Sequence, residues 1–359
     1  MKGIYLCSER RGAGIHTVCL GLFLRFRELG LNPGYFKPLG YSYFHEGELV
    51  HDEDALNMKR ILGLEDDLED ICPVIITSEL VREAMGTRCE DYATRVKDAY
   101  ARVSRGKDVM VVHGAMNTRQ GWLLGISGYH LAESLDLPVI LVERFDDVML
   151  ADNVLAAREW FGHRFRGVIY NMIPGKRQSF FRDHLRPRLE REGVRVFGEI
   201  PMESLLRSVT VSDLSSSLGG ELLTGEVAQE KLVEEVVVGA MNPEHALNVF
   251  RRKRNFCVVT GGDRSDIQLA AMEAGAGCIV LSGNLHPSPI IVSKAREMGV
   301  PIILVGTDTF STAENVEQVI RTGRSYQPSK IERLRELITG YVDVEGILEV
   351  IGLGQRPSG

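Results

Sequence analysis

Short apolar runs alternate with helical patterns along most of this 359-residue chain, and this alternation limits the folds open to it. Continuous apolar strands that alternate with helices predict an α/β fold, with a parallel sheet covered by helices on both faces. The first set of predicted strands spans residues 2–8, 33–39, 108–113, 138–143, 167–171 and 196–200. The predicted helices between them span residues 14–29, 52–63, 78–104, 122–135, 147–161 and 178–192.

After the stretch SDLSSSLGGELL the alternation starts again, which predicts a second, smaller α/β domain. We place the two domains at residues 1–218 and 219–330, and a C-terminal helix and tail at residues 331–359. The tail holds an apolar run, GILEVIGL, before an end that we expect to be disordered. The strands of the second domain are predicted at residues 232–238, 255–260, 277–281 and 300–305, and its helices at residues 243–252, 264–274, 287–298 and 311–322.

The composition excludes several classes of protein. With 44% hydrophobic and 25% charged residues the chain is typical of soluble globular proteins, and its net charge of −7 offers no basic field for a nucleic acid. No apolar run approaches the roughly 20 residues that span a bilayer, and no signal-peptide pattern opens the chain. We therefore expect a cytoplasmic protein that binds neither nucleic acid nor membrane. The six cysteines form no C-x-x-C pair, which predicts buried, reduced thiols and no metal cluster.

Residues 7–22, CSERRGAGIHTVCLGL, follow a predicted strand and lead into a predicted helix through a glycine turn. In that context, backbone N–H groups and a helix N-terminus cradle phosphate. A phosphate loop presents Lys and then Ser or Thr after its last glycine, whereas this chain has Ile15 and His16. The hydroxyl of Thr17 lies one residue, about 100° of helical rotation, further on. A simple strand-to-helix turn that binds nothing therefore remains an alternative.

Five further segments appear in series: LGLNPGYFKP, DEDALNMKRILGL, VVHGA, GVIYN and VFGEIP. In this order and spacing, the first 218 residues resemble the dethiobiotin synthetase-like P-loop fold. That version of the fold forms the N-terminal part of some phosphotransacetylases and also occurs in stand-alone proteins. Each segment alone is a weak signal, but the series is specific.

The resemblance implies roles for three residues. Lys37 would lie beside the phosphates, Asp54 would help to bind Mg²⁺, and Asn171 would read the adenine edge. Three residues depart from the family pattern. Ile15 replaces the loop Lys, His16 replaces the loop Ser or Thr, and His113 replaces the second Mg²⁺ carboxylate.

Phosphoryl transfer depends on the charge that Lys and Mg²⁺ supply, so we expect no catalytic residues. Mg²⁺ binding should be weak or absent, and ATP or another nucleotide should bind about 10²- to 10⁴-fold more weakly than in an intact site.

Basic residues in the loop could replace part of the missing charge. Arg10 or Arg11 could clamp an anion through paired hydrogen bonds, although both could equally be solvated loop charges. His16 and His113 map to the rim of the same pocket, but two histidines make a thin metal site. The predicted phosphate- or nucleotide-binding residues are Arg10, Arg11, Gly12, Gly14, His16, Thr17, Lys37 and Asn171, with Asp54 as the metal ligand.

In the second domain, the string VVTGGDRSDIQLAAMEAGAGCIVLSG places two glycines at a strand end, ahead of a helix. With VGAMNPEHALNVF upstream and GVPIILVGTDTFSTAENV downstream, residues 219–330 resemble the DRTGG domain, with Ser265 where Thr is usual. That domain accompanies phosphotransacetylases and CBS-domain proteins, so the resemblance suggests regulation. Alternatively, Asp263 only caps the next helix and Arg264 pairs with Asp266 or Asp308. The candidate ligand residues are Gly261, Gly262, Asp263, Arg264 and Thr309.

The favoured hypothesis is a non-catalytic protein that senses a small anionic metabolite or a nucleotide. It would act on a protein partner, in acetyl-phosphate or acetyl-CoA metabolism, as a homodimer formed through the second domain. We also expect the chain to lack the phosphotransacetylase catalytic domain. One alternative is an ATP-dependent enzyme of the dethiobiotin synthetase or cobyrinate a,c-diamide synthase kind, and another is a scaffold with an empty pocket.

Overall fold

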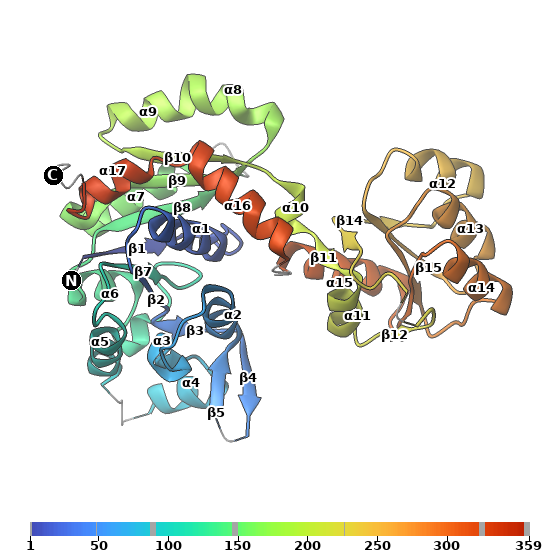
Figure 1. Cartoon of the computed structure of the whole chain (residues 1–359), viewed down its shortest axis with the longest axis horizontal. Helices are drawn as coiled ribbons and strands as arrows, with labels where there is room; N and C mark the ends of the chain where they lie inside the picture. The colour runs from blue at the N-terminus through green and yellow to red at the C-terminus, as the bar shows by residue number, and fades with distance from the viewer. Residues whose placement is uncertain are drawn as a thin grey trace. The chain divides into compact units, whose positions relative to one another are not determined.

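The computed structural model describes residues 2–47, 49–86, 91–145, 150–225, 227–322 and 327–354. The chain forms two compact units, one made of Met1–Met202 with Ile331–Gly359 and the other of Glu203–Lys330 (Figure 1). The chain thus leaves the first unit and later returns to it. The predicted C-terminal segment 331–359 lies within the first unit, and the second unit begins ahead of the predicted boundary at residue 218.

The first unit is built on a parallel six-stranded sheet in the order β10-β9-β8-β1-β7-β2. Strand β1 lies inside the sheet and is fully buried, as its continuous apolar sequence predicts. These results confirm the predicted α/β class. The six strands are β1 (Gly3–Cys7), β2 (Pro33–Phe36), β7 (Val109–His113), β8 (Val139–Arg144), β9 (Phe165–Ile173) and β10 (Val196–Pro201).

Helices cover both faces of this sheet. One face packs against α5 (Tyr92–Val103), α6 (Gly128–Ser134), α7 (Leu150–Phe161) and α9 (Arg186–Arg191), in a core that includes Tyr5, Val112 and Tyr170. Helix α1 (Ile15–Glu28) and the C-terminal α16 (Pro328–Tyr341) lie over the other face (Figure 1). Helices α2 (Glu53–Leu62), α3 (Leu68–Ile71) and α4 (Ser78–Ala84) follow β2, and α8 (Gln178–Phe180) precedes α9.

Several predicted helices are divided in the structure. The helix predicted over residues 78–104 is two helices, and each starts at its own cap: Thr77 accepts from Leu80 N and Asp91 from Thr94 N. The helix predicted over residues 122–135 is a 3₁₀ turn, Trp122–Leu124, followed by α6. The start of the helix predicted from residue 147 lies outside the described residues.

Sequence analysis did not predict two short strand pairings that follow β2. Strands β4 (Tyr43–Glu46) and β5 (Leu49–Asp52) form a hairpin, and β3 (Leu39–Gly40) pairs with β6 (Val74–Ile75). The hairpin delivers Asp52 to the start of α2, which matters for the site below.

The second unit is a smaller sheet in the order β12-β17-β16-β15-β14. Strands β14 (Glu235–Val238), β15 (Phe256–Gly261), β16 (Cys278–Ser282) and β17 (Ile302–Leu304) are parallel, and β12 (Glu221–Leu222) is antiparallel. Helices α12 (Pro243–Phe250), α13 (Ser265–Glu273) and α14 (Pro289–Glu297) connect successive strands. Helices α11 (Val211–Leu218) and α15 (Thr309–Thr322) pack with Val259 and Val280 in a separate cluster.

A short pairing and a short helix open the second unit. Strand β11 (Val209–Thr210) pairs with β13 (Leu232–Val233), and α10 (Ser204–Arg207) precedes them. The strand predicted over residues 232–238 is therefore β13 and β14 in succession, each in a different sheet.

The C-terminal segment packs on the first unit. The predicted apolar run GILEVIGL contributes to helix α17 (Val344–Val350), beside β10, where Asp343 N donates to Phe197 O at 2.6 Å. No helix in the described ranges is long and apolar enough to cross a bilayer. The five described cysteines are buried free thiols, as predicted; Cys89 and the end predicted to be disordered lie outside the described residues.

Candidate functional site

The loop between β1 and α1 keeps the backbone form of an anion-binding turn. Gly12 and Gly14 have φ values of 76° and 81°, in the left-handed region that favours glycine. No side chain caps α1 at Gly14, and its first turn holds no acidic residue. The positive end of the helix dipole therefore faces the loop without a carboxylate to neutralise it. Arg10 and Arg11 are exposed beside it.

Asn171, the predicted adenine reader, contacts the loop itself. Its Nδ2 donates to Ala13 O at 2.9 Å, and its Oδ1 accepts from Met172 N at 2.9 Å. A Cβ on Gly14 would lie 2.3 Å from the same Nδ2, so only glycine fits there. Asn171 thus holds the loop against the end of β9.

Lys37, the predicted phosphate lysine, is buried between two carboxylates. Its Nζ lies 2.7 Å from Asp52 Oδ1 and 2.7 Å from Asp54 Oδ2, and the lysine is only 4% exposed. Asp52 also caps α2 by accepting from Ala55 N at 2.9 Å. The expected phosphate ligand and the expected Mg²⁺ ligand therefore neutralise each other.

Asp52 is the residue that sequence reasoning missed at this site. The available signal was its position directly before a predicted helix, where Asp is a preferred N-cap. The pattern DED supplies two carboxylates on one side of Asp54, but it does not say which of them meets Lys37.

The two histidines lie close together in the same buried region. Their ring centroids are 5.7 Å apart, and His113 Nδ1 lies 2.7 Å from the hydroxyl of Tyr35. Burial, together with the nearby Lys37 and His16, holds the pKa of His113 well below its ordinary value, so its imidazole is neutral.

This group of side chains does not fit a Mg²⁺ site. Lys37, Asp52 and Asp54 carry a net charge of −1, and each is less than 10% exposed. Neutral imidazole is a poor ligand for Mg²⁺, which prefers oxygen. Among the described residues, no group of three or more His, Cys, Asp or Glu side chains could hold a metal ion.

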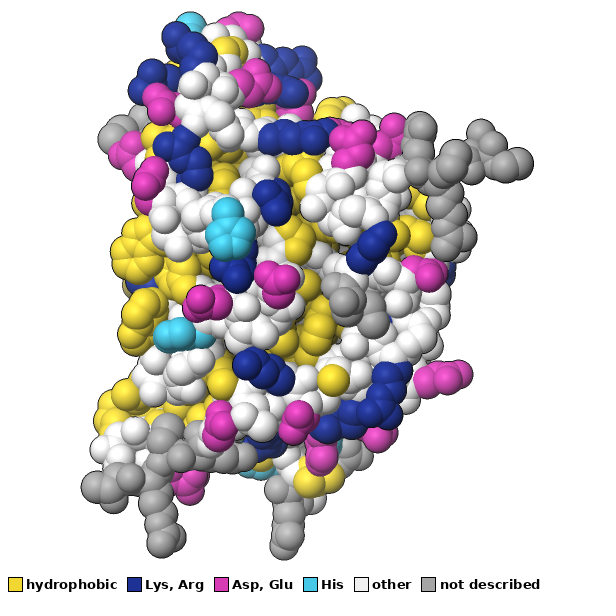
Figure 2. Space-filling view, turned by 90° about the vertical axis from the view of Figure 1, so that its left-hand side faces the viewer, with side chains coloured by type: hydrophobic (Ala, Val, Ile, Leu, Met, Phe, Trp, Pro, Cys, Tyr) yellow, Lys and Arg dark blue, Asp and Glu magenta, His cyan; other side chains and the backbone are white. Residues whose placement is uncertain are grey.

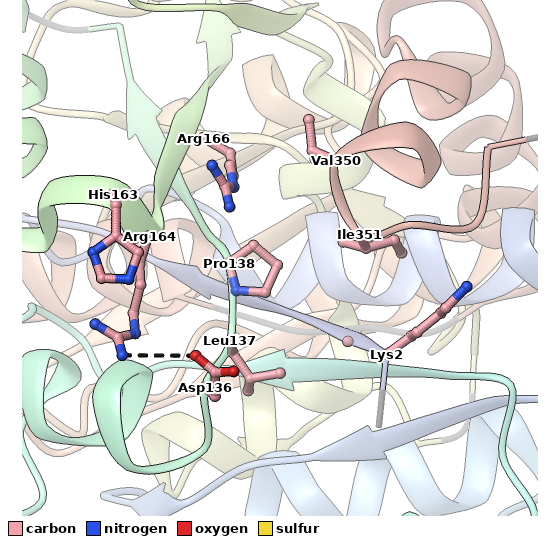
Figure 3. A pocket seen from close by; sticks show the side chains of 10 residues that line it. Lys2, Asp136, Leu137, Pro138, His163, Arg164, Arg166, Val350 and Ile351 are labelled. Atoms are coloured by element: carbon pink, nitrogen blue, oxygen red, sulfur yellow. Dashed lines mark ion pairs between the residues drawn. The ribbon is translucent and has the colours of Figure 1, made fainter.

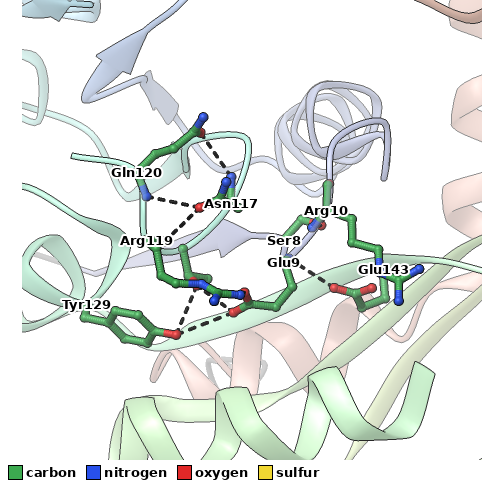
Figure 4. A network of polar contacts seen from close by, with 9 residues as sticks. Ser8, Glu9, Arg10, Asn117, Arg119, Gln120, Tyr129 and Glu143 are labelled. Atoms are coloured by element: carbon green, nitrogen blue, oxygen red, sulfur yellow. Dashed lines mark hydrogen bonds and ion pairs between the residues drawn. The ribbon is translucent and has the colours of Figure 1, made fainter. Parts of the chain in front are cut away.

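A second network of polar contacts surrounds the carboxylates of Glu9 and Glu143 at the start of the loop (Figure 4). Glu9 Oε1 accepts from Thr118 Oγ1 at 2.6 Å, and Glu9 Oε2 lies 3.4 Å from Arg119 Nη2. Glu143, at the end of β8, accepts from Glu9 N at 3.1 Å. Burial raises the pKa of Glu143 to about 7, and the nearby charge of Glu9 adds to the effect. Sequence reasoning missed this network, whose visible sign was an acidic residue in the loop.

In the second unit, the structure brings Gly261, Gly262 and Thr309 to the carboxyl edge of the sheet. A Cβ on Gly262 would lie 1.7 Å from Leu285 O, so the loops after β15 and β16 are in direct contact. The buried Gln268 donates to Gly261 O at 2.8 Å and to Gly262 O at 3.1 Å. The hydroxyls of Thr309 and Ser282 are 2.7 Å apart. This edge is where ligands bind in parallel α/β sheets.

The charged residues of the same edge mostly hold its turns. Arg264 pairs with Asp266 at 3.0 Å, as one alternative predicted, and donates to Met241 O at 3.0 Å. The predicted cap by Asp263 is wrong, because the N-cap of α13 is Arg264 and no side chain caps it. Asp308 accepts from Phe310 N and Ser311 N at the start of α15. With three aspartates and one arginine, this edge carries no surplus positive charge.

The sheet order and the glycine loop that opens α1 define a P-loop type of α/β domain. The chain belongs to the AAA_26 family, described as an AAA domain, which matches residues 2–210. A DRTGG domain matches residues 213–319. Both predicted resemblances are thereby confirmed.

Curated relatives carry the name phosphate acetyltransferase. The protein from Pseudomonas aeruginosa is 26% identical over 377 aligned positions, which cover 98% of this chain and 52% of the relative. The Nitrosomonas europaea protein is 25% identical and is covered to the same 52%. The chain thus spans about half the length of the curated relatives that it matches.

Similar solved structures include a cobyrinic acid a,c-diamide synthase from Mycobacterium smegmatis with bound ADP and magnesium. It is 15% identical with a TM-score of 0.38, and the match covers 56% of this chain and 87% of that one. The CBS and DRTGG domains of a Clostridium perfringens pyrophosphatase, complexed with diadenosine tetraphosphate, match with a TM-score of 0.28. The identity there is 15%, over 45% of this chain and 78% of that one.

Proposed function

We propose that this chain is a regulatory protein that binds a nucleotide or another phosphate-bearing anion without transferring its phosphoryl group. The ion pairs of Lys37 with Asp52 and Asp54 carry the proposal. Phosphoryl transfer requires positive charge at the terminal phosphate, and this lysine is already neutralised inside the protein. Ile15 and the neutral His113 supply no replacement.

The loop supports anion binding for a separate reason. The N-terminus of α1 has no acidic residue in its first turn, and Arg10 and Arg11 are exposed next to it. Helix N-termini and arginines bind phosphate through backbone N–H groups and paired guanidinium hydrogen bonds. Mg²⁺ contributes little to this mode of binding.

The relatives named phosphate acetyltransferase suggest the metabolic setting. The chain would act on a protein partner in acetyl-phosphate or acetyl-CoA metabolism, in the cytoplasm. We propose that it acts as a homodimer through the second unit, whose exposed apolar side chains include Leu285, Ile290 and Phe310.

Calorimetric titration with ATP, with and without Mg²⁺, tests the proposal alongside a hydrolysis assay. We expect modest ATP binding, no dependence on Mg²⁺ and no hydrolysis of ATP or GTP. The double variant Ile15→Lys/His16→Ser should bind ATP about one to three decades more tightly, because it restores one or two charge-assisted contacts.

The variant Asp54→Asn distinguishes anion binding without catalysis from ATP-dependent catalysis. Asp183→Asn, at an exposed aspartate of the same unit, is its control. Asp54→Asn removes one carboxylate from the Lys37 group. This variant should still show no ATP hydrolysis, and it should bind anions several-fold more tightly. Mg²⁺-dependent turnover on the order of 1 s⁻¹ that Asp54→Asn abolished would instead favour the ATP-dependent synthetase alternative. If the double variant binds ATP no better than the wild type, the loop is only a turn.

A further inference from the structure

A pocket of about 200 Å³ lies in the first unit, at the end of the sheet opposite the glycine loop. Its residues precede β1 and β8, open β9 or end α17 (Figure 3). Figure 1 places the N-terminus and α17 on the same side of this unit, and Figure 2 looks onto that side. There, Lys and Arg side chains are mixed with Asp and Glu side chains around areas of hydrophobic surface. Nothing in the phosphate-loop argument involves this pocket.

The pocket has more positive than negative charge. Lys2, Arg164 and Arg166 line it with His163, against a single carboxylate, Asp136. Asp136 lies 3.6 Å from Arg164, but its side chain is 91% exposed, so solvent weakens the pair. Within the described ranges, the side chains of Arg166 and His163 form no hydrogen bond or ion pair. Their donors are therefore available to a ligand.

The floor of the pocket is apolar. Leu137 and Ile351 are 1% and 7% exposed, and Pro138 lies between them and the basic side chains in Figure 3. In the same view Arg164, Arg166 and His163 lie on one side, and Lys2 on the other. The volume is below the roughly 300–1,000 Å³ of sites for drug-sized ligands, so the occupant is a small molecule.

We propose that this pocket binds a small organic anion with a short carbon chain. The guanidinium groups of Arg166 and Arg164 hold its oxygens, because their planar donors match a carboxylate or a phosphate. The carbon chain lies on Leu137, Pro138 and Ile351. The site is independent of the glycine loop and of any nucleotide bound there.

Titration followed by NMR or calorimetry tests the proposal with four probes that share one butyl chain. Pentanoate and monobutyl phosphate carry the two kinds of oxyanion, 1-butanol carries no charge, and butylamine carries the opposite charge. Saturable binding of one or both anions, with no binding of 1-butanol or butylamine, supports the proposal. The stronger anion identifies the ligand as a carboxylate or a phosphate ester. Absence of saturable binding by both anions overturns it.

Three variants locate the bound anion. Arg166→Gln should weaken binding about 10- to 100-fold, the effect of losing charge-assisted hydrogen bonds. Arg60→Gln, at an exposed arginine on α2, is the matched control and should have no effect. Asp136→Asn should tighten binding several-fold, because it releases Arg164, and Asn tolerates the φ of 48° at this position. Equal affinities in wild type, Arg166→Gln and Arg60→Gln would place the anion elsewhere and overturn the proposal.

Discussion

At the scale of single residues, the partner of a charged side chain decides what that side chain can do. Lys37 stands where a phosphate-binding lysine is expected, yet both of its nearest charged atoms belong to buried aspartates. A phosphate that reached Lys37 would have to displace both aspartates and lose its own hydration shell. Both steps cost free energy. The same residue type at the same place in the sequence thus belongs to a buried ion-pair group.

The variant Lys37→Met should lower the free energy of unfolding by about 3 to 5 kcal/mol, because it leaves Asp52 and Asp54 buried without their cation. Urea denaturation measures the loss. Lys176→Met, at an exposed lysine, should leave stability unchanged. Unchanged stability of Lys37→Met together with lost ATP affinity would show that the lysine is free to bind phosphate.

The carboxyl of Glu143 should make stability depend on pH. Its pKa is raised from an ordinary 4.5 to about 7 in the folded protein, so the folded state binds more protons than the unfolded chain between these values. Stability contributed by this group is complete below pH 4.5, falls as the pH rises to about 7, and is constant above that.

Glu143→Gln stays uncharged and should lack this fall. Above pH 7 it should exceed the wild type by on the order of 3 kcal/mol, since one pKa unit corresponds to about 1.4 kcal/mol. Urea denaturation over a range of pH measures the difference, with the exposed Glu133→Gln as control. A constant difference between wild type and Glu143→Gln at all pH values would contradict the titration of this carboxyl.

Changes of residue type from the family pattern could be predicted from the sequence better than the side-chain contacts of this site. Ile15, His16 and His113 are visible as changes of residue type, so their chemical consequences follow from the sequence. The roles of Lys37 and Asn171 depend on Asp52 and Ala13, and those contacts require the hairpin and the loop to be folded. Residue types alone do not fix which of several nearby carboxylates a lysine meets.

At the scale of elements, long apolar runs were the reliable signal. All six strands of the first sheet were predicted, because each is a continuous apolar run flanked by helices. Divisions within helical stretches were missed, since Thr77 and Asp91 act through local hydrogen bonds that compete only weakly with helical periodicity. The β4–β5 hairpin was missed because its strands, YFHE and LVHD, each hold only two apolar residues in succession.

Close packing between α1 and α16 allows a test of one element contact. A Cβ on Gly21 would lie 2.4 Å from Ile338 Cγ1, so Gly21→Ala should cost about 1 to 3 kcal/mol of stability through overpacking. Ile338→Ala should cost about 2 to 5 kcal/mol through its cavity. The double variant should cost less than the sum, because alanine at position 338 makes room for the new methyl group. Additive effects in urea denaturation would mean that the helices do not touch there.

At the scale of the whole molecule, the first unit is discontinuous in sequence. Its core includes Leu337, Ile338 and Ile347, which are at most 1% exposed and come from beyond the second unit. Composition and periodicity indicated two α/β units but could not show that the last helices return to the first. That return depends on which apolar face remains uncovered once the sheet has formed.

Deletion of residues 331–359 should therefore unfold the whole first unit, and the rest of the unit should not stay folded without its last helices. Burial of three Leu or Ile side chains contributes about 5 to 9 kcal/mol, which is comparable with the whole stability of a domain. Near-ultraviolet circular dichroism and urea denaturation measure the loss. Glu345→Gln, at an exposed residue of α17, is the control and should change neither. A cooperative, unaltered unfolding transition after the larger deletion would show that α16 and α17 are accessory.

The discontinuity also sets an order of events during synthesis on the ribosome. Gly21 and the rest of α1 emerge first, but the helix that covers them is translated only after Glu203–Lys330 has been made. At about 5 to 20 residues per second, that interval lasts on the order of ten seconds. Throughout it, the nascent sheet carries an uncovered apolar face on which chaperones can act. All residues of the second unit are synthesised before the last helices of the first unit.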